Sequence, residues 1–164
     1  MLKRTALALL MTVGSASAAH AQNDAHIATV QSGKSCAGCN LFQADLSYKD
    51  ADKINLGNAR LRQADLSLTT YDDVIFTKAN MSVANLFGAR FNRCSFKDAD
   101  LTHAVAVGTY FGSSDLSGAI LKDVNLSGAD LSIARGLTQT QLNQACGDMT
   151  TRLPKGKTVP HCRS

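Results

Sequence analysis

The sequence predicts an all-β solenoid, and three observations carry this prediction. Mostly large side chains occupy every fifth position from Leu41, and the count keeps its register as far as Gly136. A second series of small residues, mostly Ala, Val, Thr, Ser or Cys, lies two positions before each large one. The composition agrees, because 45% of the residues are hydrophobic but only 5% are aromatic. A period of five fits neither an α-helix nor a β-strand, so the units must stack as coils to bury a core.

The repeated units resemble those of the pentapeptide-repeat family. Six of them match its A(D/N)LXX signature closely, namely ADLSY, ARLRQ, ADLSL, ANLFG, ADLTH and ADLSI, and the resemblance covers about residues 39 to 138. It implies a right-handed quadrilateral β-helix in which four units make one coil. The twenty units would then make about five coils. We place this β-helix at residues 39–137.

The aromatic residues provide a check on four units per coil, since residues twenty apart would then stack. Tyr71, Phe91 and Phe111 would form one inward column, and Phe76 and Phe96 the next. Three units per coil would scatter these rings among leucines. Offset aromatic contacts add to the gain from burial, so a stacked aromatic core is expected.

One unit departs from the pattern. Residues Lys49 to Lys53 place a lysine at the small inward position and only Ala51 at the large one. Because an unpaired buried lysine is costly, we expect a bulge or loop there, with Lys49 turned outward. An irregular functional site is the alternative.

The N-terminus has the pattern of a signal peptide. Lys3 and Arg4 precede an apolar run from Ala6 to Val13, which is too short to span a membrane. Small residues at 19 and 21 predict cleavage after Ala21, so residues 1–21 would be removed. A buried N-terminal helix is the alternative. The mature chain would be periplasmic or secreted, without stable membrane insertion, and residues 22–38 would form a lead-in segment.

Residues 138–164 are expected to cover the C-terminal end. The stretch LTQTQLNQAC predicts a short helix, with Thr138 as its N-cap and Gln141 closing a capping box. The following tail, from Thr151, is expected to return as an irregular segment. Cys146 and Cys162 flank it and are disulfide partners in an oxidising compartment, closing a loop worth about 3 kcal/mol on the chain-entropy model.

Cys36 and Cys39 form a Cys-x-x-Cys pair at the start of the repeats. Such a pair can be a structural disulfide, a redox dithiol or half of a metal site to which His26 could contribute. We favour the structural disulfide. The fifth cysteine, Cys94, occupies a small inward position and is expected to be a buried thiol.

Several outward positions carry apolar side chains. Phe87, Val105 and Val107 fall on one wall, with Leu68 one coil below and Tyr110 beginning the next wall. An exposed apolar patch is more often an interaction surface than a set of apolar residues without a role at the surface. We therefore expect Phe87, Val105, Val107 and Tyr110 to bind a partner. Local covering by neighbouring side chains is the alternative.

Charged residues twenty apart predict two ladders across adjacent coils. Asp73 would lie under Arg93, and Lys78 under Asp98. Arg90 and Lys97 would complete a mildly basic edge. Each such exposed pair contributes only a fraction of a kcal/mol.

The function predicted is that of a non-enzymatic scaffold or protein-binding module. We identify no catalytic residue, metal ligand set or cofactor site, and all 13 acidic residues are Asp. The partner is an unknown protein and not a nucleic acid, since the mature net charge is small. Some relatives in the resembled family mimic DNA and bind DNA gyrase, but this chain lacks their acidic surface. A monomer is expected, and a periplasmic thiol-disulfide protein using Cys36 and Cys39 is the alternative.

Overall fold

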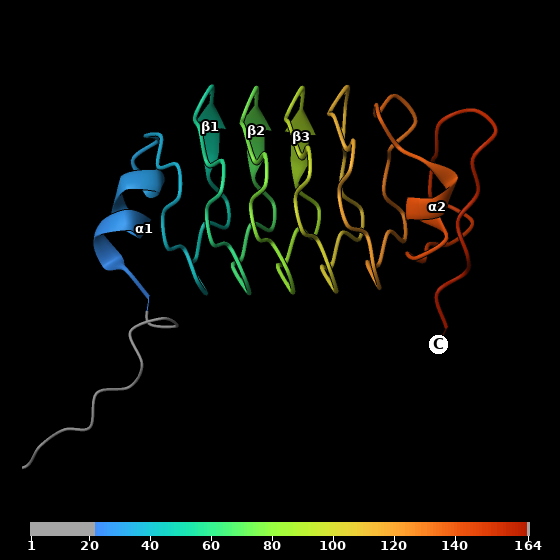
Figure 1. Cartoon of the computed structure of the whole chain (residues 1–164), viewed down its shortest axis with the longest axis horizontal. Helices are drawn as coiled ribbons and strands as arrows, with labels where there is room; N and C mark the ends of the chain where they lie inside the picture. Colours follow the sequence, from blue (N-terminus) through green and yellow to red (C-terminus); the bar gives the residue numbers. More distant parts are fainter. Residues whose placement is uncertain (1–21, 164) are drawn as a thin grey trace, which may run out of the picture.

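The computed structural model describes residues 22–163, and the predicted signal peptide lies outside them. The described chain forms a row of stacked coils with a helix near each end (Figure 1). Its elements are α1 Asp24–Gln31, β1 Asp50–Asp52, β2 Thr70–Asp72, β3 Arg90–Asn92 and α2 Gln139–Leu142. Neither helix in this part of the chain has the length and apolar character needed to cross a bilayer.

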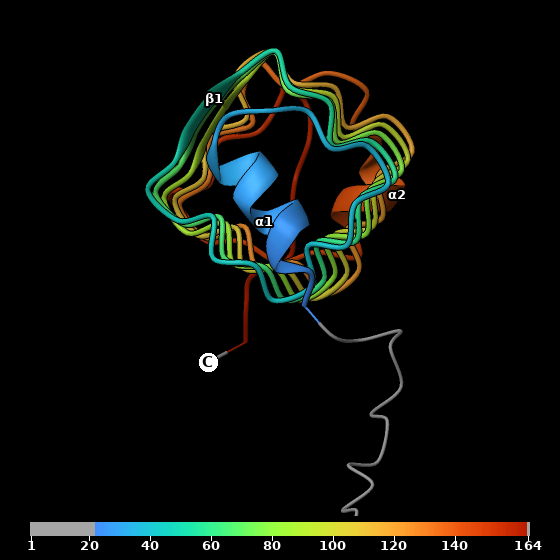
Figure 2. The same ribbon diagram turned by 90° about the vertical axis from the view of Figure 1, so that its left-hand side faces the viewer.

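Residues twenty apart pair as parallel neighbours along most of the described chain. In the sheet β1-β2-β3, Ala51, Tyr71 and Phe91 lie in register. Isolated parallel bridges repeat this spacing elsewhere, from Asn40↔Arg60 to Asp115↔Arg135. Viewed along the row, successive coils superimpose on one closed outline (Figure 2). One turn of the chain therefore takes four five-residue units, and the predicted twenty-residue stacking is confirmed.

Each side of a coil, which we call a wall, ends in a corner with left-handed backbone. The residue concerned lies two positions after the large inward one, as Gln43 follows Leu41 and Asn58 follows Leu56. A typical corner is closed by Ala44 N donating to Leu41 O at 3.1 Å. Within residues 22–163, fourteen residues other than glycine take a positive φ in this way, although such values are uncommon. Main-chain bonds to neighbouring coils hold these conformations in place.

The aromatic residues form the continuous centre of the core. Tyr71, Phe76, Phe91, Phe96 and Phe111 are each at most 1% exposed. Within columns, ring centroids lie 5.0 Å apart for Phe76–Phe96 and 5.7 Å for Phe91–Phe111. Between columns, Phe91 and Phe96 meet edge-on at 5.1 Å. The predicted aromatic stack is confirmed, and its offset and edge-on contacts are the arrangements that rings prefer.

The wall that carries β2 and β3 uses inward side chains to satisfy main-chain carbonyls. Cys94 N donates to Ser114 Oγ at 3.0 Å instead of closing the corner on Phe91 O. Ser114 Oγ donates to Phe91 O at 3.1 Å, and Cys94 Sγ donates to Tyr71 O at 3.3 Å. Burial raises the pKa of the Cys94 thiol to about 12, so the thiol keeps the proton that it donates. Cys94 thus has a structural place in the core.

The unit from Lys49 to Lys53 keeps a regular backbone, so the predicted bulge or loop is wrong. Ala51 pairs with Tyr71, and Lys49 O accepts from Thr70 N at 3.1 Å. The Lys49 side chain is exposed, as expected. Because the ladder joins main-chain groups only, the side chain can turn outward while the strand stays in register.

Helix α1 covers the N-terminal end of the coils, as Figure 2 shows, and lies in the segment described above only as a lead-in. Asn23 caps its first turn, and Val30 is buried in the core. His26 Nδ1 accepts a hydrogen bond from Asn40 N at 3.1 Å, a main-chain donor on the outer edge of the first coil. The helix therefore covers an edge that would otherwise be open to strand pairing.

Helix α2 follows the prediction closely. Thr138 Oγ1 accepts from Gln141 N at 3.2 Å, and Gln141 Oε1 accepts from Thr138 N at 2.8 Å, which completes the capping box. Leu142 and Ala145 are buried against the core, at 0% and 5% exposure.

Beyond α2 the chain rejoins the ladder through isolated bridges, while the tail from Thr151 to Arg163 forms no helix or strand, so the predicted irregular segment is present but pairs with the last coil at single residues. Cys146 pairs with Asn125, and Arg152 with Asp130, both in parallel. The inserted helix lengthens the spacing from twenty residues to 21 and 22. A further bridge joins Gly147 to the segment around residue 161, so the tail adds partial layers to the end of the solenoid.

Replacing Phe91 with Ala is expected to lower the free energy of unfolding by about 3–5 kcal/mol, because a fully buried ring leaves a cavity. Phe87→Ala is the matched control, since that ring is 49% exposed and its loss should cost less than about 1 kcal/mol. Denaturant unfolding of both variants measures the difference. Equal losses would contradict a core built on the aromatic column.

Candidate binding surface

Three of the four predicted contact residues lie on one wall, made of residues 45–48, 65–68, 85–88, 105–108 and 125–128, which we call the Phe87 wall. Phe87 and Val105 are 49% and 43% exposed, and Val107 is half-buried. Gly88 N donates to Val107 O at 2.9 Å, so the main chains beside Phe87 and Val107 are direct neighbours. The wall thus presents a cluster of apolar side chains to solvent.

Two further apolar residues extend this cluster toward the N-terminal coils. Leu68 is 43% exposed, and its side chain lies across Gly88, where an added Cβ would come within 2.8 Å of Leu68 Cδ2. Tyr48, twenty residues before Leu68, is 73% exposed. The sequence analysis missed Tyr48, although counting back one coil from Leu68 identifies it.

Tyr110 lies apart from this cluster, on the neighbouring wall. Its ring covers Gly112, where a side chain would overlap it. The Arg90 guanidinium sits 4.8 Å from the ring centroid in a cation–π contact. Tyr110 is half-buried, and its ring is in contact with Arg90 and Gly112. For this residue the alternative given above, covering by neighbouring side chains, therefore applies.

Polar groups border the apolar cluster and are themselves fixed by short hydrogen bonds. Asp45 Oδ1 accepts from Ser47 N at 3.0 Å and Ser47 Oγ at 2.6 Å. The Ser47 hydroxyl lowers the pKa of Asp45, so this carboxylate stays ionised. One coil on, Asn85 Nδ2 donates to Asp65 Oδ1 at 3.1 Å. The Phe87 wall therefore combines an exposed apolar strip with the carboxylates Asp45 and Asp65 on its earlier coils.

The wall of β1 and β2 carries a shallow acidic hollow of about 420 Å³, lined by Asp50, Ala51, Asp52, Thr70 and Asp72. It is open to solvent. Within residues 22–163, no group of three or more His, Cys, Asp or Glu is arranged to hold a metal ion.

The first predicted charge ladder is present beside this hollow. Arg93 donates to both carboxylate oxygens of Asp73, each at 2.9 Å. The second predicted pair, Lys78 with Asp98, forms no ion pair in the described chain. Arg93 is exposed and Asp73 is half-buried, so the pair fixes side-chain positions more than it adds stability.

Cys36 and Cys39 are bonded to each other on the edge of the first coil, with Cα atoms 5.4 Å apart. Cys39 is buried at 7% exposure, and Cys36 is half-buried. Cys36 N donates to Asn55 O at 2.8 Å, so the pair starts the ladder of its wall. The pair thus lies where it can fix the first layer of coils.

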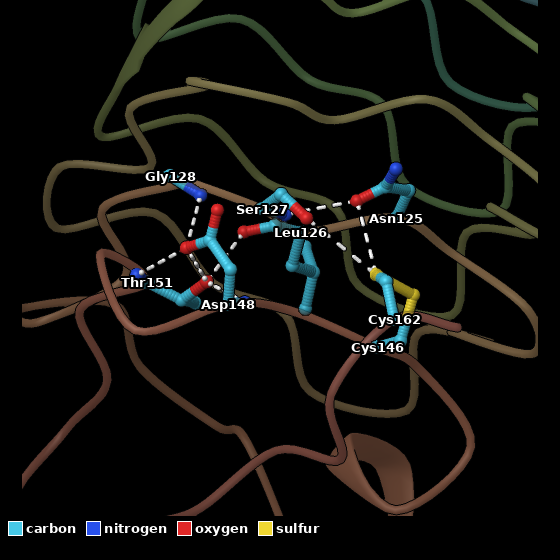
Figure 3. Close-up of a disulfide and its surroundings, with 8 residues drawn as sticks. All are labelled: Asn125, Leu126, Ser127, Gly128, Cys146, Asp148, Thr151 and Cys162. Carbon is cyan, nitrogen blue, oxygen red and sulfur yellow. Dashed lines mark hydrogen bonds between the residues drawn. A yellow bond between two sulfur atoms is a disulfide. The ribbon is translucent and has the colours of Figure 1, made fainter. Parts of the chain in front are cut away.

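Cys146 and Cys162 are also bonded, with Cα atoms 4.7 Å apart, and Figure 3 shows their surroundings. Ser127 Oγ donates to Cys162 Sγ at 3.5 Å. Asn125 Oδ1 lies 3.3 Å from the same sulfur, a contact and not a hydrogen bond because a disulfide sulfur carries no hydrogen. The bridge ties the end of the chain to the last coil.

Beside this bridge, one carboxylate organises the turn that follows Cys146 (Figure 3). Asp148 Oδ1 accepts from Gly128 N, Thr150 N and Thr151 N at 3.1, 2.8 and 3.1 Å. The Thr150 hydroxyl, at 2.7 Å, is the main reason why the pKa of Asp148 falls to about 2. Disulfide and carboxylate together hold the C-terminal layers in place.

A family model for pentapeptide repeats matches residues 39–70, 54–93 and 94–132, in eight copies. These stretches cover more than half of the chain. No curated protein matches it.

Solved structures of the same kind resemble the chain weakly. One is HetL, a pentapeptide repeat protein involved in heterocyst differentiation regulation in the cyanobacterium Nostoc sp. strain PCC 7120. Its sequence is 23% identical to this chain, and the two structures superpose with a TM-score of 0.42. The match covers 79% of this chain and 61% of HetL. A thylakoid-lumen protein of Arabidopsis thaliana is 25% identical, with a TM-score of 0.32 and coverages of 64% and 55%. QnrB1, a plasmid-mediated fluoroquinolone resistance protein, is 16% identical, with a TM-score of 0.45 and coverages of 78% and 90%. The chain thus spans less than two thirds of the length of HetL and of the thylakoid-lumen protein.

Asp148→Asn should lower the thermal midpoint at neutral pH, and the deficit should shrink in acid. The carboxyl group protonates near pH 3.9 in the unfolded chain but near pH 2 when folded. Its contribution is therefore complete above about pH 4 and is lost as the pH falls toward about 2. Thermal unfolding of both proteins across this range measures the effect. A deficit that stays constant with pH would contradict it.

Proposed function

The chain belongs to the pentapeptide-repeat family, and on that premise we propose that it is an exported, non-enzymatic scaffold that binds a protein partner through the Phe87 wall. In this proposal the fold is a right-handed quadrilateral β-helix of about five coils. Residues 1–21 direct export to the periplasm or beyond. The protein acts as a monomer, since helices and the tail cover both ends of the coils.

The observation that supports this proposal is that apolar residues replace the usual polar ones at outward positions of a few repeats. On the Phe87 wall, the position before the large residue is Asp45, Asp65, Asn85 and Asn125, but it is Val105 on one coil. The position after the large residue is Ser47, Ser67 and Ser127, but Phe87 and Val107 on adjacent coils. Solvent-facing apolar residues at positions otherwise polar indicate a contact surface.

The chemistry of the wall describes the partner. Phe87, Leu68 and Val105 offer an apolar strip, and Tyr48 adds an aromatic ring of the kind enriched in binding hot spots. Asp45 and Asp65 border the strip with negative charge. The partner is therefore a protein surface with an apolar ridge flanked by basic or amide side chains.

A variant that restores the repeat pattern tests this proposal. Phe87→Ser with Val105→Asn introduces only residues that the same two positions already carry on other coils, so the fold and the net charge should be kept. Cross-linking in intact cells, followed by pull-down, is expected to recover a partner with the wild type. Recovery with the variant should fall at least about tenfold, since contact residues of this kind each contribute more than about 1 kcal/mol.

The matched control is Ile75→Asn with Ile120→Asn. These residues are 41% and 48% exposed on other walls, and the same positions carry Asn55 and Asn80 on other coils. The control should capture the partner as the wild type does. Equal capture by all three proteins, or equal loss in both variants, would contradict binding through the Phe87 wall.

A further inference from the structure

The positive charge of the protein is concentrated at its C-terminal end. Residues 22–148 contain 11 Lys and Arg against 13 Asp, whereas residues 149–163 contain Arg152, Lys155, Lys157 and Arg163 and no acidic residue. Figure 1 shows this segment as the outermost layer at that end of the row of coils. We call residues 149–163 the end face.

Two carboxylates, Asp130 and Asp148, border the end face. Asp148 Oδ1 is directed to the amides of Gly128 and Thr150. Asp130 lies 3.7 Å from Arg152. Within residues 22–163 no ion pair involves Lys155, Lys157 or Arg163. Arg152 is therefore paired, whereas Lys155, Lys157 and Arg163 present basic groups with no ion-pair partner in this part of the chain.

The end face is held in shape by several bonds. The Cys146–Cys162 disulfide closes it at one side. At the other side, Gln139 Nε2 donates to Thr158 O at 2.9 Å, and Thr158 N donates to Gln139 Oε1 at 3.2 Å. Lys155 and Lys157 thus lie on a loop fixed at both ends, and less entropy is lost when they bind a surface.

We propose that the end face binds the surface of an anionic lipid bilayer. Basic residues gathered on one face are attracted to anionic headgroups, each adding to the affinity. Met149, next to them in sequence, is 93% exposed and offers an apolar side chain that suits the headgroup boundary. The end face contains no Phe, Tyr or Trp on which successive bases could stack, which disfavours a single-stranded nucleic acid.

Binding by this face places the coils on end above the bilayer. The Phe87 wall runs along the row of coils and not across its end, so it stays accessible to a partner. The two surfaces can therefore act at the same time.

Vesicle co-sedimentation of the exported chain, starting at Gln22 and with both disulfides formed, tests the proposal. The protein is expected to partition onto phosphatidylcholine vesicles that contain phosphatidylglycerol, and not onto phosphatidylcholine alone. Partitioning should weaken as salt is raised. Lys155→Gln with Lys157→Gln should reduce it roughly 25-fold, about fivefold for each lysine.

The matched control is Arg60→Gln with Arg62→Gln, which removes the same charge from exposed positions on the second coil. It should partition nearly as the wild type does. Equal losses in both variants, equal binding to neutral vesicles, or no binding to anionic vesicles at low salt would overturn the proposal. Tighter binding to duplex DNA than to anionic vesicles at the same salt would also overturn it. Circular dichroism spectra matching the wild type establish that both variants fold.

Discussion

Main-chain hydrogen bonds between adjacent coils, which set residues twenty positions apart in register, hold the structure together, and the other features depend on them. Such a ladder puts each side chain directly above the one in the previous coil. Inward columns must then contain side chains that stack on one another, as Tyr71, Phe91 and Phe111 do. It also requires a left-handed corner every five residues, even where the corner residue is Val83 or Leu68. The spacing thus decides both the composition of the core and the strain that the backbone carries.

A ladder of this kind ends in unpaired groups at both ends, and the two ends are treated differently. At the N-terminus a single helix lies over the opening, and His26 accepts from an edge amide. At the C-terminus α2 covers part of the opening, and the chain then adds partial layers that the Cys146–Cys162 bridge retains. In both places a disulfide lies where the ladder starts or stops. An end coil has a neighbouring coil on one side only, and the covalent link restrains the chain there.

Much of the coil geometry could be read from the sequence because the period and the aromatic columns test each other. Helix α1 was missed because its eight residues have weak periodicity, with Ile27 and Val30 as the main apolar signal. The bulge expected at Lys49 was wrong because a single side chain does not govern a ladder made of main-chain groups. On the candidate surface, the exposure of Phe87 and Val105 could be predicted from their outward positions in the five-residue unit. The covering of Tyr110 could not be predicted in this way, because its contact with Arg90 and Gly112 depends on rotamers that sequence spacing does not reveal.

The four-unit turn also limits how such a protein can change in length. Inserting twenty residues would add one coil and leave every wall facing as before. Inserting five would rotate everything after the insertion by a quarter turn, so that Phe87 would no longer stand over Leu68 if the change fell between them. The chain departs from this spacing at helix α2, after which paired residues lie 21 and 22 positions apart. Only the final layers come after this helix, so the walls before it are unaffected. Changes in length by whole coils are therefore neutral for its surfaces, whereas smaller steps would reorient one face of the molecule against another.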